Sequence, residues 1–149
     1  MITDALYAAS QAGVPVELWV RGICGVRAGV PGLSDNIRVR SILGRFLEHS
    51  RLFWFDNGGN PVVGLGSSDL MHRNLDRRVE VLVSITNSDH ITQIGTLFDL
   101  AFDDGTVGWW LTPEGWVEHT RGPDGAALRD LQEHLIHITA DRRRAKEPK

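Results

Sequence analysis

The sequence contains a single cysteine, Cys24, among its 149 residues. One cysteine excludes an internal disulfide and any zinc site built from several cysteines, which agrees with a reducing compartment. No run of about 18 apolar residues occurs, and the first residues lack the basic start and apolar stretch of a signal peptide. We therefore expect a cytoplasmic protein without an integral membrane segment, and we leave membrane association open.

Lysine is absent from the first half of the chain, where every positive charge is a guanidinium. Residues 1–80 contain nine arginines and eight acidic residues, whereas residues 81–149 contain seven basic and eleven acidic ones. The stretch 21–51 has six arginines against only Asp35 and Glu48. A guanidinium offers paired planar donors that match phosphate oxygens, although such a cluster is more often a solvated face with scattered ion pairs. The net charge of −3 argues against a general nucleic-acid binder.

The hydrophobic pattern predicts one domain over residues 1–149, with a disordered charged tail at 142–149. A helix over 4–11 ends at Gly13, a buried strand follows over 14–20, and a loop occupies 21–34. The other expected elements are a strand or helix over 36–43, a short helix over 44–49, strands over 52–55, 61–66 and 79–85, helical segments over 70–77 and 89–102, two short strands within 108–117, and a helix over 123–144 that starts at Pro123. This order indicates an α/β fold with a mixed β-sheet flanked by helices.

His49 and Arg51 precede the strand predicted at 52–55, and Gly66 and Ser67 end the next strand. An imidazole can attack phosphorus or move a proton, a nearby cation stabilises phosphate oxygens, and a hydroxyl donates to them. This order is similar to the His-x-Lys and Gly-Ser elements of the phospholipase D superfamily, with Arg51 in place of lysine. By themselves these residues are a weak signal, because isolated histidines near strands are usually structural or exposed and Gly-Ser is a common turn.

A longer set of segments decides between these interpretations. They are Val20-Arg21-Gly22-Ile23-Cys24, Pro31-Gly32-Leu33-Ser34-Asp35-Asn36-Ile37-Arg38, Arg45-Phe46-Leu47-Glu48-His49, Asn57-Gly58-Gly59, Gly66-Ser67-Ser68-Asp69 and Arg73-Asn74-Leu75-Asp76-Arg77-Arg78-Val79-Glu80. Together they closely resemble the last domain of polyphosphate kinases, most strongly from about residue 8 to residue 83. The resemblance implies a phospholipase D-like domain that forms the C-terminal catalytic part of such an enzyme.

The resemblance also implies roles for individual residues. Arg21 and His49 stand where the family contacts ATP, and we assign His49 as catalytic as well. The family transfers the γ-phosphoryl group of ATP, with Mg²⁺, through a phosphohistidine to a growing polyphosphate chain, and the reaction is reversible. That phosphohistidine and the metal ligands belong to other parts of the enzyme, so we expect ATP or ADP, polyphosphate and upstream domains as partners. We expect this chain to be a fragment that is inactive alone.

Other side chains are weaker candidates. Arg51, Ser67, Arg73 and Arg77 are expected to line the phosphate path, although Arg73 and Arg77 could equally form ion pairs with nearby acids. His134 and His137 share a helical face but need a third ligand to bind a metal, so no metal ligand is assigned. His72 and His119 have no evident partners, and Cys24 is expected to be a small buried residue.

Two alternatives remain open. The first is a phospholipase D-like phosphodiesterase, which needs two His-Lys-type motifs and could obtain them from a homodimer. The second is a non-catalytic module that binds polyphosphate through its arginines. The sequence leaves homo-oligomerisation open as well.

Overall fold

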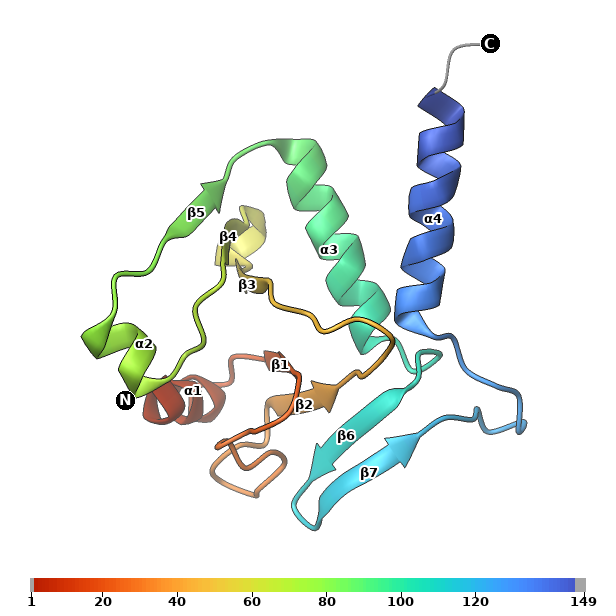
Figure 1. Cartoon of the computed structure of the whole chain (residues 1–149). Helices are drawn as coiled ribbons and strands as arrows, with labels where there is room; N and C mark the ends of the chain where they lie inside the picture. The colour runs from red at the N-terminus through yellow and green to blue at the C-terminus, as the bar shows by residue number, and fades with distance from the viewer. Residues whose placement is uncertain (1, 147–149) are drawn as a thin grey trace. The chain divides into compact units, whose positions relative to one another are not determined.

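The computed structural model describes residues 2–146, and Figure 1 shows its helices and strands. None of the helices within that range is long and apolar enough to cross a membrane. The chain divides into two compact units, one built from residues before Glu48 and after Asp99, the other from Glu48–Asp99. We call them unit 1 and unit 2. The elements in chain order are α1 Ile2–Gln11, β1 Val16–Val20, β2 Ile37–Ser41, β3 Arg51–Phe55, η1 Asn57–Gly59, β4 Val62–Gly66, α2 His72–Arg77, β5 Leu82–Ile85, α3 Ser88–Phe102, β6 Gly108–Thr112, β7 Gly115–His119 and α4 Leu131–Lys146.

The sheet of unit 1 has the strand order β1-β2-β6-β7 (Figure 1). β1 and β2 are parallel, whereas β2 pairs with β6, and β6 with β7, in antiparallel fashion. The sheet of unit 2 is antiparallel throughout, with the order β3-β4-β5. The expected α/β class with a mixed sheet and helices is therefore confirmed, and the ambiguous stretch 36–43 contains strand β2.

The core of unit 1 forms on one face of β2. Ile37 and Val39 are buried together with Val26 and Ala28, and residues of α1 and β1 pack against them. Successive side chains of a strand point to opposite faces, so Arg38 and Arg40 share the other face of β2. The alternation of β2 therefore puts two guanidinium groups opposite an aliphatic core.

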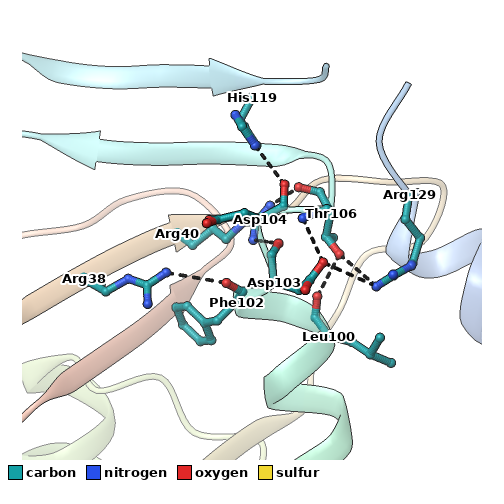
Figure 2. Close-up of polar contacts among 10 residues, drawn as sticks. Arg38, Arg40, Leu100, Phe102, Asp103, Asp104, Thr106, His119 and Arg129 are labelled. Atoms are coloured by element: carbon teal, nitrogen blue, oxygen red, sulfur yellow. Dashed lines mark hydrogen bonds and ion pairs between the residues drawn. The ribbon is translucent and has the colours of Figure 1, made fainter. Parts of the chain in front are cut away.

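The second face of β2 is organised around Arg40, which is 0% exposed. Its guanidinium donates to the carbonyl oxygens of Asp103, at 2.7 Å, and of Thr106 (Figure 2). The same guanidinium lies 4.6 Å from the centre of the Trp110 ring. Burial lowers the pKa of Arg40, while the carboxylates of Asp104 and Asp103 oppose that shift. A buried cation therefore holds the turn that follows α3.

Further contacts fasten the same turn (Figure 2). The hydroxyl of Thr106 donates to the carbonyl oxygen of Leu100 at 2.8 Å, and Arg129 lies 3.8 Å from the carboxylate of Asp103. A ring nitrogen of His119 donates to the carbonyl oxygen of Asp104 at 2.9 Å. His119, expected to have no partner, therefore has a structural one.

In unit 2 the strand β4 is flanked closely by β5. A Cβ atom at Gly66 would lie 2.8 Å from the carbonyl oxygen of Val81, a distance that side chains do not tolerate. The end of β4 therefore requires glycine for close approach of the two strands.

Trp54 of β3 packs edge-on against Phe98 of α3, with ring centres 6.4 Å apart.

Replacing Gly66 by alanine should destabilise unit 2, because β5 must move away from β4 to admit the methyl group. We expect a loss of about 1–3 kcal/mol in the free energy of unfolding. Urea denaturation, together with hydrogen exchange of the β4 and β5 amides, measures it. Gly25→Ala is the matched control, because open space surrounds Gly25 and its backbone conformation suits alanine. Equal stability of the two variants would contradict the prediction.

Two expected helices differ from the structure. The stretch 44–49 is not helical, because the side chain of Gln132 binds the backbone of Phe46 and occupies the space beside Gly44. The last helix begins at Leu131 rather than at Pro123. Residues Gly122–Gly125 form a turn instead of a helix, and the carboxylate of Asp130 caps the start of the helix by accepting from the amide of Glu133.

The end of the chain was expected to be disordered over residues 142–149. Helix α4 continues to Lys146, so residues 142–146 are helical. Residues 147–149 of that expected tail lie outside the described residues.

Candidate functional site

Arg21 directly follows β1 and is exposed. Because β1 and β2 are parallel, their carboxyl ends meet at one edge of the unit 1 sheet, where α/β proteins commonly bind ligands. The segment that contains Gly44 and Arg45 leaves β2 at this same edge. Arg21 and the segment that follows β2 therefore leave the unit 1 sheet at the same edge.

The loop after Arg21 is held at its far end. The hydroxyl of Ser34, which is completely buried, accepts from the amide of Val30 at 3.0 Å, and the amide of Arg27 donates to the Tyr7 hydroxyl at 2.9 Å. Near Arg21 the loop is open, and Ile23 is 98% exposed. The loop is therefore held by hydrogen bonds at Arg27 and Val30, while Arg21 at its start is exposed.

Helix α4 fixes the segment after β2. Gln132 accepts from the backbone amide of Phe46 at 2.7 Å and donates to its carbonyl oxygen at 2.9 Å. A Cβ atom at Gly44 would lie 2.5 Å from Oε1 of Gln132, so only glycine leaves room for this amide. The segment that leads toward His49 is thus bound through its backbone, a contact that nothing in the sequence pattern indicates.

His49 and Ser67 lie at the same end of the β3–β4 hairpin in unit 2. The strands are antiparallel, with Arg51 opposite Gly66, so the start of β3 and the end of β4 coincide. His49 precedes β3 by two residues and Ser67 follows β4 directly, and both are exposed. Unit 2 therefore brings together two of the predicted phosphate-site residues.

Arg51 is engaged by a carboxylate. Its Nε and Nη2 atoms donate to Oδ1 of Asp69 at 2.8 and 2.6 Å, and Nη1 donates to the carbonyl oxygen of Ser50 at 3.2 Å. Only 20% of its side chain is exposed. Asp69 was not predicted as a functional residue, although it lies two residues after Ser67, which was.

Arg73 and Arg77 lie on the short helix α2 and are exposed. Within residues 2–146 neither forms an ion pair; Arg78 instead contacts Glu80 at 3.3 Å, and His72 pairs with Asp76. His72 was expected to lack a partner, so this pair is a correction. The ion pairs at α2 therefore involve His72 and Arg78, and Arg73 and Arg77 lie exposed on the surface of unit 2.

The described part of the chain contains no group of three or more histidine, cysteine, aspartate or glutamate side chains that could bind a metal ion. His134 and His137 therefore have no third ligand there. The ligands of the Mg²⁺ that the family resemblance implies were expected outside this chain, and that expectation stays a prediction.

The comparisons with known proteins agree with one another. Residues 1–130 match the family model described as polyphosphate kinase C-terminal domain 2. The polyphosphate kinase of Streptomyces coelicolor is 58% identical over 143 residues, covering 95% of this chain and 19% of the relative. That of Mycobacterium tuberculosis is 50% identical over 136 residues, covering 91% of this chain and 18% of the relative.

A solved structure supports the same relationship. The crystal structure of polyphosphate kinase from Porphyromonas gingivalis matches with a TM-score of 0.86 and 29% identity, covering 97% of this chain and 22% of that one. This chain thus spans about a fifth of the length of the relatives it matches. The resemblance inferred from the sequence is confirmed, and the chain belongs to the polyphosphate kinase C-terminal domain 2 family.

Proposed function

We propose that this chain is the nucleotide- and phosphate-contacting C-terminal domain of a polyphosphate kinase. Such an enzyme transfers the terminal phosphate of ATP reversibly to polyphosphate. The family match over residues 1–130 carries this proposal. The exposed positions of Arg21, at the carboxyl edge of β1 and β2, and of His49, at the end of the β3–β4 hairpin, support it.

The chemistry of each residue suits this role. Phosphoryl transfer depends mostly on positioning and on stabilising charge, and a guanidinium can bind two phosphate oxygens at once. We assign Arg21, in unit 1, to a contact with the phosphates of ATP, and His49, in unit 2, to an ATP contact through a hydrogen bond or a proton. Ser67, Arg73 and Arg77 are second-rank phosphate contacts. The histidine that accepts the phosphoryl group lies in a domain outside this chain.

A chimeric enzyme tests the proposal. This chain replaces the matching 143 residues of the Streptomyces coelicolor polyphosphate kinase, and polyphosphate formation from ATP is measured. We expect synthesis within about tenfold of the parent, because 58% identity preserves the packed interfaces of a domain. The parent enzyme without these residues is the control and should be inactive.

Three results would contradict the proposal. The first is a folded chimera with no more activity than the truncated control, because this chain would then fail to replace the family's C-terminal domain. Hydrolysis of phosphodiesters by the purified chain would favour the phospholipase D-like alternative. Binding of polyphosphate with no binding of ATP, in the chain and in the chimera, would favour a non-catalytic module.

A further inference from the structure

We propose that Arg51 and Asp69 form a positioning pair that sets the geometry of His49 and Ser67, and that Arg51 does not itself bind phosphate. The inference rests on the proposed function of His49. It changes the expected role of Arg51 from phosphate ligand to an arginine that acts through Asp69.

The pair closes the functional end of the β3–β4 hairpin. Arg51 is the first residue of β3 and lies two residues after His49, while Asp69 lies two residues after Ser67. The backbone ladder ends at the pairing of Arg51 with Gly66, so it does not constrain the residues beyond that point. The ion pair joins the two chain segments where the ladder has ended. The positions of His49 and Ser67 relative to each other therefore depend on it.

The donors of Arg51 are directed at protein acceptors. Two of its nitrogens donate to one oxygen of Asp69, and the third donates to the backbone beside His49. Charge-assisted hydrogen bonds of this kind are short and strong, and a partly buried ion pair is costly to break. A phosphate would have to displace the carboxylate before it could bind Arg51. By contrast, the imidazole of His49 is exposed and accessible to a ligand.

The two possible roles of Arg51 predict opposite effects of Asp69→Asn. If Arg51 binds phosphate directly, loss of the carboxylate frees the guanidinium and removes a negative charge, so ATP should bind equally well or more tightly. If the pair positions His49 and Ser67, loss of either partner should weaken ATP binding by a similar factor. The sign of the Asp69→Asn effect therefore separates the two roles.

The experiment uses the purified 149-residue chain titrated with ATP by calorimetry. We expect Arg51→Ala and Asp69→Asn each to weaken ATP binding about five- to tenfold, as is typical for coupled pairs. The double variant Arg51→Asp with Asp69→Arg should recover most of the affinity. Arg144→Ala is the matched control, because Arg144 is an exposed arginine that pairs with Asp141 at 2.5 Å; it should bind ATP like the wild type.

A second measurement does not depend on ATP. In nuclear magnetic resonance spectra, Asp69→Asn and Arg51→Ala should shift the amide signals of His49 and Ser67, while the signals of β4 stay in place. Unchanged signals for His49 and Ser67, or tighter ATP binding by Asp69→Asn, would overturn the positioning role. If the wild-type chain and the chimera both fail to bind ATP, the proposed function fails, and the spectra still decide whether the pair positions these residues.

Discussion

Replacing Arg21 by alanine in the chimeric enzyme is expected to lower the rate of polyphosphate synthesis about 100-fold, the usual effect of removing a donor that stabilises transferring charge. Arg21 stands at the carboxyl edge of β1 and β2 on an anchored loop, so the alanine variant should keep the fold. Arg21→Lys should recover only part of the rate, because an ammonium keeps the charge and loses the paired donors. Initial rates at several ATP concentrations measure both variants.

His49→Ala should act in the same direction as Arg21→Ala. If both residues serve one phosphate group, the double variant should lose less than the product of the two single losses. Arg27→Ala is the matched control, since Arg27 is an exposed arginine of the same loop that has no assigned role. Near-normal turnover of Arg21→Ala, or an equal loss in Arg27→Ala, would contradict the assignment of Arg21.

The largest expected effect on stability belongs to Arg40. Arg40→Ala leaves the carbonyl groups of Asp103 and Thr106 without their buried donor and removes the cation beside Trp110. We expect a loss of about 3–5 kcal/mol in the free energy of unfolding, a large share of the stability of an ordinary domain. Urea denaturation followed by tryptophan fluorescence measures this loss.

Two further variants separate the causes. Arg40→Met restores buried volume without donors, so it should lie between wild type and alanine if packing contributes. Arg38→Ala is the matched control, because Arg38 lies 4.8 Å from the same ring but its side chain is 53% exposed, and it should cost at most about 1 kcal/mol. A similar cost for Arg38→Ala and Arg40→Ala would show that burial of the cation is unimportant.

Local chemistry made much of the fold predictable. Some sequence signals depend only on neighbours in the chain, such as the aliphatic residues of β1, the glycines that follow β3 and the periodicity of α3. The strand, the turn and the helix that these signals predict occur where they were expected. Two of the differences from the expected fold, at 44–49 and at Pro123, have a shared cause. In both places a distant or turn-forming contact outweighs helix propensity, as when Gln132 binds the backbone of Phe46.

The sequence by itself determined the family, the α/β class and the candidate residues Arg21 and His49, because these depend on which residues occur and in what order. Only the tertiary structure showed that Arg40 is a buried cation and that Arg51 pairs with Asp69. An arginine on a strand has the same local pattern whether it faces water, phosphate or a carboxylate. The partner that decides among these comes from a residue far away in the chain, which only the folded arrangement brings near.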